Sequence, residues 1–149
     1  MDVAVRPAVA ADGPAVAHLE GEARAAVAEQ RGGPELLAGC PTLDATGWQD
    51  RFAADGWRTL VGTIDDVVVG FAAVRRAGTT ATISHLYVTP EAREVGIGEA
   101  IVEDLLAWAP SAGAIALEAT ALPGDRETKN LFERVGMKAR AITVSRRLG

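Results

Sequence analysis

The chain has 149 residues, of which 48% are hydrophobic and 23% are charged, and its formal net charge is −5. This length and composition indicate one domain, over residues 1–149, with a substantial hydrophobic core. The acidic balance argues against a general nucleic-acid-binding protein, and no apolar run approaches the roughly 18 residues that would indicate a membrane span.

The first third of the chain predicts one strand and one long helix, followed by an irregular region. Residues 3–5 alternate in the way typical of a short strand. Asp12 is typical of a helix N-cap, and apolar residues at helical spacing predict a helix over 15–30. Residues 31–47 contain several prolines and glycines, and 49–54 predict a short second helix. Because long loops in compact domains are often functional, we expect a lid or a wall of an acceptor site here.

Strand-like segments dominate the rest of the chain. They are predicted at 57–64, 67–76, 81–88, 114–120 and 137–148. The first three follow one another through tight turns and are therefore antiparallel. A long helix beginning at Ile97 separates the third from the fourth, and this strand–helix–strand unit predicts a parallel crossover. A further helix over 126–135 precedes the last strand.

A loop with two glycines joins the strand at 81–88 to the long helix. Pro90 ends the strand, because proline lacks the N–H that a sheet ladder requires. From Ile97 onward apolar residues recur at helical spacing, so the helix begins directly after the loop. Gly96 and Gly98 leave the backbone N–H groups of this helix N-terminus accessible, and such groups attract anions. The sequence therefore predicts a site for a pyrophosphate.

The element order and two segments resemble the GCN5-related N-acetyltransferase (GNAT) family. The family loop has glutamine or arginine, two variable residues, glycine, one variable residue, and then glycine or alanine. Residues 93–98 have this pattern, as Arg-Glu-Val-Gly-Ile-Gly, and residues 125–137 resemble the last helix of the family. The resemblance implies a mixed α/β (α+β) fold. Its mostly antiparallel central sheet would have about six to seven strands, flanked by about four helices.

The resemblance also implies a function, in which acetyl-CoA donates an acetyl group to a primary amine of a small molecule, peptide or protein. The amine would attack directly, without a covalent enzyme intermediate, and a homodimer is compatible with the family. The backbone N–H groups from Glu94 to Glu99 would bind the pyrophosphate, and the backbone from Leu86 to Val88 would pair with the pantetheine arm. The resemblance assigns cosubstrate binding to Leu86, Tyr87, Val88, Arg93, Glu94, Val95, Gly96, Ile97, Gly98, Glu99, Asp125 and Phe132.

The chain departs from the family pattern at three of these positions. Glu94 stands where the family often has glycine or a basic residue, so a carboxylate lies beside the expected phosphate site. Phe132 stands where the family commonly has a tyrosine that protonates the departing thiolate. Phe132 can pack against the pantetheine but cannot donate a proton. Asp125 takes the place of the family asparagine and is also typical of a helix N-cap.

Three residues are candidates for acid–base catalysis, which typically contributes about 10²–10⁴-fold to a rate. His85, whose ordinary pKa is near neutral, is a candidate base, or alternatively a partly buried sheet residue. Glu118 could accept a proton directly or through water, or could simply be an outward-facing polar residue. Tyr87 is the only tyrosine, and therefore the only phenol that could protonate a thiolate; the alternative is sheet packing.

Two other functions compete with the transferase. The absence of a tyrosine at Phe132 is compatible with a weakly active or inactive acyl-CoA-binding regulatory module. Gly96 and Gly98, with Glu118 about twenty residues on, superficially fit a dinucleotide-binding fingerprint. The third glycine of that fingerprint is Ile101 here, and the loop after the strand is too long for it.

The remaining reactive residue types predict no metal site and a reducing environment. Asp65 and Asp66 lie in a hairpin turn without the further oxygen ligands that a cation requires. Cys40 is the only cysteine, so it cannot form an internal disulfide. Residues 1–8 lack the pattern of a secretory signal, and we therefore expect a cytoplasmic protein.

Overall fold

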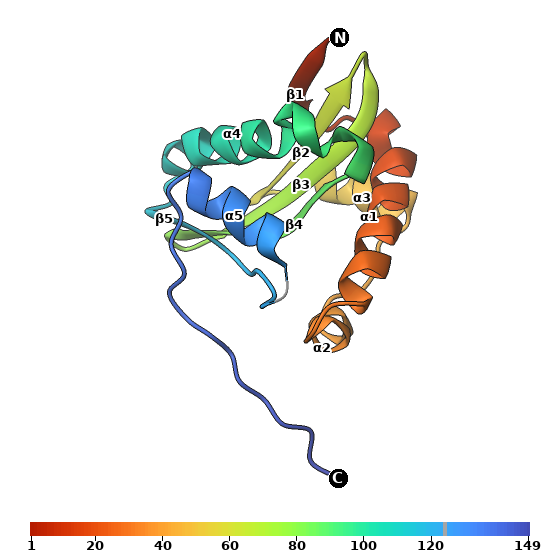
Figure 1. The fold of residues 1–149 in the computed structure, drawn as a ribbon. Helices are drawn as coiled ribbons and strands as arrows, with labels where there is room; N and C mark the ends of the chain where they lie inside the picture. The colour runs from red at the N-terminus through yellow and green to blue at the C-terminus, as the bar shows by residue number, and fades with distance from the viewer. Residues whose placement is uncertain (124) are drawn as a thin grey trace.

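The structure is a computed structural model that describes residues 1–123 and 125–149. Within them the chain has a mixed α+β fold around a five-stranded sheet, in the order β1-β2-β3-β4-β5 (Figure 1). The strands are β1 (Val3–Pro7), β2 (Trp57–Ile64), β3 (Val67–Ala77), β4 (Thr80–Val88) and β5 (Ala116–Ala119). The α-helices are α1 (Gly13–Ala28), α2 (Gly33–Ala38), α3 (Ala45–Phe52), α4 (Ile97–Ser111) and α5 (Arg126–Arg134). Two 3₁₀ turns are η1 (Ala10–Asp12) and η2 (Pro90–Val95).

The sheet confirms the predicted fold class. Neighbouring strands are antiparallel from β1 to β4, and only β4 and β5 are parallel, with α4 as the crossover between them. Asp65 and Asp66 form the two-residue turn between β2 and β3, with φ angles of 48° and 66°. Such positive angles match the turn to the twist of a hairpin.

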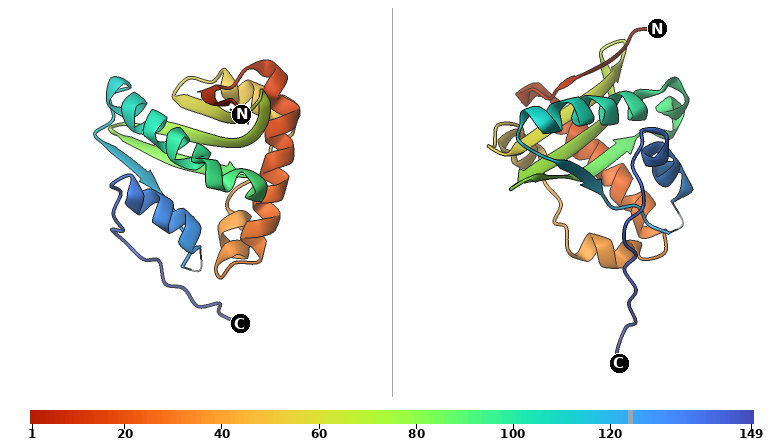
Figure 2. Two further views of the ribbon diagram at one scale, coloured as in Figure 1. Left: turned by 45° about the horizontal axis from the view of Figure 1, so that its top comes forward. Right: turned by 90° about the vertical axis from the view of Figure 1, so that its left-hand side faces the viewer.

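Helices cover both faces of the sheet (Figure 2). Residues that alternate along β2 and β3 build two separate cores. Leu60 and Ala72 pack with α4 and α5 on one face, whereas Val61 and Phe71 pack with α1 and α3 on the other. This alternation follows from the two-residue period of a strand. The two helical layers meet at the end of β4, and the cavity described below lies there.

A close approach between β2 and α4 fixes the start of α4. A Cβ atom at Gly62 would lie 2.4 Å from Cγ2 of Ile97, which is fully buried. Real side chains do not reach such a distance, so only glycine permits this packing. The first residue of α4 is thereby held against the sheet, next to the glycine loop.

Asp12 precedes α1 as predicted, but its carboxylate does not cap the helix. It forms a bidentate ion pair with Arg6, at 2.7 and 3.0 Å, and accepts a hydrogen bond from the Val9 N–H. These contacts lower the pKa of Asp12, chiefly through the hydrogen bond from Arg6. The residue links β1 to the start of α1.

Two expectations from the sequence are wrong. The region over 31–47 contains the short helix α2, which begins at a glycine and a proline. The predicted last strand is absent: within the described residues, those after Met137 extend away from the sheet (Figure 1). Ile142 and Val144 are 85% and 88% exposed. Alternation alone does not make a strand, because its backbone must also find a hydrogen-bonding neighbour. The sheet therefore has fewer strands than the six or seven expected.

Candidate active site

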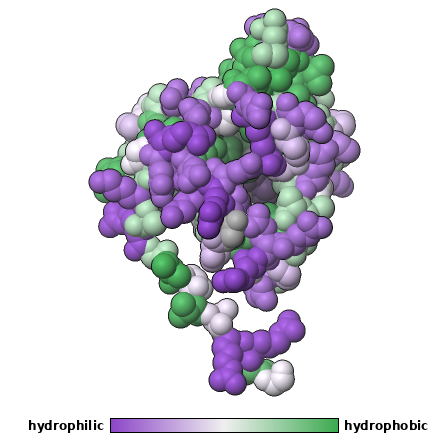
Figure 3. All heavy atoms as spheres, in the orientation of Figure 1, coloured by the Kyte–Doolittle hydropathy of each residue, from purple (hydrophilic) through white to green (hydrophobic). Residues whose placement is uncertain are grey.

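A cavity of about 440 Å³ opens between the second half of α1, the end of β4, the glycine loop and α5. Figure 3 shows it as a hollow near the middle of the molecule, bordered mainly by hydrophilic residues. Nine of the twelve residues predicted to bind the cosubstrate line it. They are Leu86, Tyr87, Val88, Arg93, Glu94, Gly96, Gly98, Glu99 and Asp125.

The three remaining residues do not face the cavity, as its described lining residues show. Ile97 is fully buried and Phe132 is 8% exposed, both within the core on the α4 side of the sheet. Val95 packs against the same core. The neighbours of Phe132 on α5, Asn130 and Leu131, line the cavity instead.

The glycine loop presents the N-terminus of α4 to the cavity. Gly96 precedes the helix with φ 80° and ψ 14°. Residues other than glycine adopt this left-handed backbone conformation only with strain. Gly98 lies in the first turn, where a Cβ atom would be 3.2 Å from Cδ2 of Leu131. The first N–H groups of a helix have no partner within it, and the helix dipole favours an anion there.

Beside this loop, β4 turns an edge toward the cavity. Its pairing with β5 ends at Ile83 and Ala119, and the residues of β4 from Leu86 to Val88 line the cavity beyond that point. Nε of Arg93 donates to the Val88 carbonyl at 3.0 Å. A strand edge of this kind can pair with an extended ligand that has amide groups.

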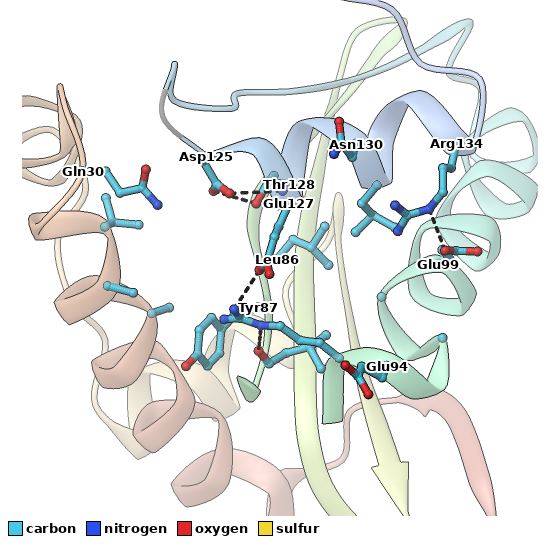
Figure 4. Close-up of a pocket in the computed structure, with 18 residues that line it drawn as sticks. Gln30, Leu86, Tyr87, Glu94, Glu99, Asp125, Glu127, Thr128, Asn130 and Arg134 are labelled. Atoms are coloured by element: carbon cyan, nitrogen blue, oxygen red, sulfur yellow. Dashed lines mark hydrogen bonds and ion pairs between the residues drawn. The ribbon is translucent and has the colours of Figure 1, made fainter. Parts of the chain in front are cut away.

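Two ion pairs connect α5 to the opposite wall of the cavity (Figure 4). Arg93 binds Glu127 at 2.8 Å, and Arg134 binds Glu99 at 2.8 Å. All four side chains line the cavity, and Glu94 and Asp125 add further negative charge. A ligand with phosphate groups would therefore compete with Glu127 and Glu99 for the two arginines.

Tyr87 is the candidate acid–base residue that reaches the cavity. Its hydroxyl donates to Oε2 of Glu22 on α1 at 3.1 Å. Burial and this carboxylate raise the pKa of Tyr87 above its ordinary value of 10.0. The phenol therefore keeps its proton at neutral pH and can donate it.

His85 lies on the same face of β4 but is enclosed by other side chains. Its Nε2 is 2.9 Å from Oε2 of Glu20, and its Nδ1 is 2.7 Å from Oγ of Ser84. Its ring packs edge-on against that of Trp48. Burial lowers the pKa of His85 below its ordinary value of 6.5, although Glu20 opposes this shift. As a base, His85 would first have to give up one of these hydrogen bonds.

The other two predicted polar residues have different positions. Glu118 is exposed on β5 and pairs in register with Thr82, before the point where β4 and β5 separate. Asp125 lines the cavity and caps α5, since its carboxylate accepts from the N–H and the hydroxyl of Thr128. Asp125 is therefore both a helix N-cap and a residue of the cavity wall, as expected from the sequence.

The sequence did not point to Glu20 and Glu22, the carboxylates that bind His85 and Tyr87. Both lie within the predicted helix, 65 residues from their partners on β4. Glutamate is common on exposed helical surfaces, so nothing in the local sequence separates these two from solvated residues. Among the described residues there is no cluster of metal-ligating side chains, and no helix has the length and apolarity needed to cross a bilayer.

The sequence and the fold both have known counterparts. The sequence profile of the Acetyltransferase (GNAT) family matches residues 27–137. Among curated proteins there is no match. A tetramutant of a Bacillus halodurans protein superposes with a TM-score of 0.81 at 21% identity, covering 97% of this chain and 99% of that one.

Two acetyltransferase structures are similar over the whole chain. A ribosomal-protein-alanine N-acetyltransferase from Brucella melitensis has a TM-score of 0.73 at 19% identity, covering 99% of this chain and 100% of that one. An aminoglycoside acetyltransferase from an uncultured soil metagenomic sample, in complex with sisomicin, has a TM-score of 0.74 at 14% identity. It covers 99% of this chain and 95% of the other. At these identities the similarity is one of fold.

Proposed function

This chain belongs to the Acetyltransferase (GNAT) family, and from this premise we propose that it transfers an acetyl group from acetyl-CoA to a primary amine. One observation carries the proposal: a single cavity joins the N-terminus of α4 to the edge of β4. The two features match the two parts of the cosubstrate. The helix N-terminus suits the pyrophosphate, and the strand edge from Leu86 to Val88 suits the amide groups of the pantetheine arm.

The residues at the loop fit this cosubstrate. The Gly96 conformation and the contact of Gly98 with Leu131 keep side chains away from the phosphate position. Arg93 and Arg134 supply cations within the same cavity. Glu94 is exposed at its rim and would weaken phosphate binding modestly, because its charge is screened by solvent.

In the proposed reaction the neutral amine attacks the thioester carbonyl carbon, and the carbon–sulfur bond breaks with its electron pair going to sulfur. We assign to Tyr87 the donation of a proton to this thiolate. Glu22, which is 38% exposed and accepts the Tyr87 hydrogen bond, can return a proton from solvent to the phenol. Neither His85 nor Glu118 is among the described residues that line the cavity, so as alternative bases they would accept the proton that the amine loses through intervening water.

We expect the acceptor to be a small-molecule, peptide or protein amine. The carboxylate of Glu22 lies 3.1 Å from the Tyr87 hydroxyl and is 38% exposed, which supports negative potential on this side of the phenol, although Arg93 lies over the ring at 5.7 Å. That potential would attract an ammonium group to this side of β4.

We also expect a cytoplasmic protein. The exposed Ile142 and Val144 support a homodimer, which light scattering would detect.

A thiol-release assay with acetyl-CoA and a panel of polyamines, aminoglycosides and peptides tests the transfer. We expect release above the rate without amine for at least one class. The second candidate, an inactive acyl-CoA-binding module, is favoured by the lack of a phenol at Phe132. It predicts acetyl-CoA binding without amine-dependent release. Phe132→Tyr belongs in the same assay: Phe132 packs in the core and is not among the described residues that line the cavity, so we expect no increase in release, and an increase would identify the missing hydroxyl as the defect.

A further inference from the structure

Glu20 is an acidic residue on α1 that is 1% exposed. Its Oε1 accepts from the backbone N–H of Leu43 at 3.0 Å and from Nε1 of Trp48 at 3.2 Å. Its Oε2 is hydrogen-bonded to Nε2 of His85 on β4 at 2.9 Å. A buried carboxylate is costly unless donors surround it, and here three donors come from three different segments. Glu20 therefore ties α1 and α3 to one position on β4.

The contact continues through His85 to Ser84. The Ser84 hydroxyl lies 2.7 Å from Nδ1 of His85 and 3.2 Å from the carbonyl oxygen of Ala73 on β3; with Nε2 of His85 donating to Glu20, these two acceptors share its one proton. Ala73 pairs with His85, whereas Val74 pairs with Ile83, so Ser84 is an extra residue in β4. It forms a β-bulge, and the hydrogen bonds that begin at Glu20 end on this bulge.

The bulge lies where β4 leaves β5. The parallel pairing runs from Thr80 with Ala116 to Ile83 with Ala119, and it stops immediately before Ser84. A bulge bends its strand and increases the local twist. After this bend, the residues from Leu86 to Val88 line the cavity rather than continuing the pairing with β5.

We propose that Glu20 and His85 are positioning residues that act through Ser84 to hold the β4 bulge, and so keep the edge from Leu86 to Val88 open for the pantetheine arm. Neither residue is among the described residues that line the cavity. Their effect on acyl transfer is therefore indirect. The part of this inference that concerns pantetheine rests on the proposed function, whereas the bulge itself can be tested without any ligand.

Ser84→Ala is the most direct test, because Ser84 is exposed and its loss leaves the buried Glu20 contacts to Leu43 and Trp48 in place. Thr82→Ala is the matched control, since Thr82 is an exposed residue of β4 just before the bulge. Ser84→Thr keeps the hydroxyl and is therefore the conservative variant at the same position. Glu20→Gln keeps the size and the acceptor oxygen, and serves as a second variant at the other end of the network.

Amide hydrogen exchange of the ligand-free protein reports on the bulge. We expect the amides from His85 to Val88 to exchange at least about threefold faster in Ser84→Ala than in the wild type, as local opening becomes easier. Thr82→Ala and Ser84→Thr should stay within about twofold of the wild type. Equal exchange in Ser84→Ala and Thr82→Ala would overturn the proposal, whatever the protein binds.

Acetyl-CoA titration and steady-state kinetics report on the consequence. We expect Ser84→Ala and Glu20→Gln to raise the Kd and the KM for acetyl-CoA by about threefold to tenfold. The KM for the amine should stay unchanged, and kcat should change less than KM. Wild-type affinity in both variants would overturn the positioning role while leaving the transferase intact. A wild type that binds no acetyl-CoA would instead contradict the proposed function and the pantetheine role together, while altered exchange would still support the bulge contact.

Discussion

The hydroxyl of Tyr87 on β4 donates a hydrogen bond to Oε2 of Glu22 on α1, at 3.1 Å. This contact spans the space between the sheet and the first helix, beside the cavity. It joins the chain's one phenol to a carboxylate that reaches solvent. A proton that leaves the phenol can therefore be replaced without a change in the buried part of the site.

Replacing Tyr87 by phenylalanine should lower kcat, because the thiolate then has to leave without a positioned acid. General acid catalysis typically contributes about 10²-fold or more, and we expect a loss of about that size. The ring stays in place, so the Kd for acetyl-CoA should change little. Glu22→Gln is the comparison, since the amide oxygen can still accept from the phenol. Steady-state kinetics would exclude Tyr87 as the acid if Tyr87→Phe retained wild-type kcat.

The ion pairs of Arg93 with Glu127 and of Arg134 with Glu99 should oppose the binding of phosphate groups. Glu127→Gln and Glu99→Gln should each tighten acetyl-CoA binding by about twofold to fivefold, because exposed ion pairs are worth at most about 1 kcal/mol. The gain should shrink at high salt.

Glu103→Gln, on the exposed side of α4, is the matched control for these two variants. It removes the same charge, from the helix that carries Glu99, without touching the described lining of the cavity. Weaker binding in Glu127→Gln and Glu99→Gln would mean that the ion pairs hold α5 in the binding geometry.

His85 should make the stability of the fold depend on pH. Its folded-state pKa is below the ordinary value of 6.5, so between the two values the unfolded chain binds more protons. The free energy of unfolding should therefore fall as the pH drops from about 6.5, and level off below the folded pKa. Burial is the main cause; Arg24 and Arg51 also lower the pKa, while Glu20 opposes the change.

Denaturant unfolding between about pH 5 and pH 8 measures this dependence. The slope in this window should disappear in His85→Gln and persist in His18→Gln, which removes the other histidine of the chain, exposed on α1. If the slope disappeared in His18→Gln instead, His18 rather than His85 would cause the pH dependence.

Local patterns in the sequence were sufficient for the elements around the site. Strand-like apolar runs separated by tight turns predicted β2, β3 and β4, and the change of period at Ile97 predicted the start of α4. The N-cap at Asp125 predicted the start of α5. The glycine loop could be found because its conformation requires glycine at fixed positions, and the positive φ of Gly96 illustrates this requirement.

Features that depend on distant contacts could not be predicted. The carboxylate of Glu20 is buried only because Leu43, Trp48 and His85 converge on it from 23, 28 and 65 residues away. The segment around Ile142 alternates like a strand, yet no neighbouring strand pairs with it among the described residues. Burial and pairing are properties of the whole fold, and they have no local signal in the sequence.

We propose that the glycine loop binds the phosphates of acetyl-CoA, and titration calorimetry with Gly98→Asp is the sharpest experiment on this role. The wild type should bind acetyl-CoA at one site with a Kd in the range of about 1 μM to 1 mM. Gly98→Asp should show no binding, because its side chain would bring bulk and negative charge to the phosphate position. Gly21→Asp adds the same charge on α1, where a side chain meets nothing within 4 Å, and should bind like the wild type. Equal binding by Gly98→Asp and the wild type, or no binding by the wild type at millimolar ligand, would show that the glycine loop does not bind the phosphates of acetyl-CoA.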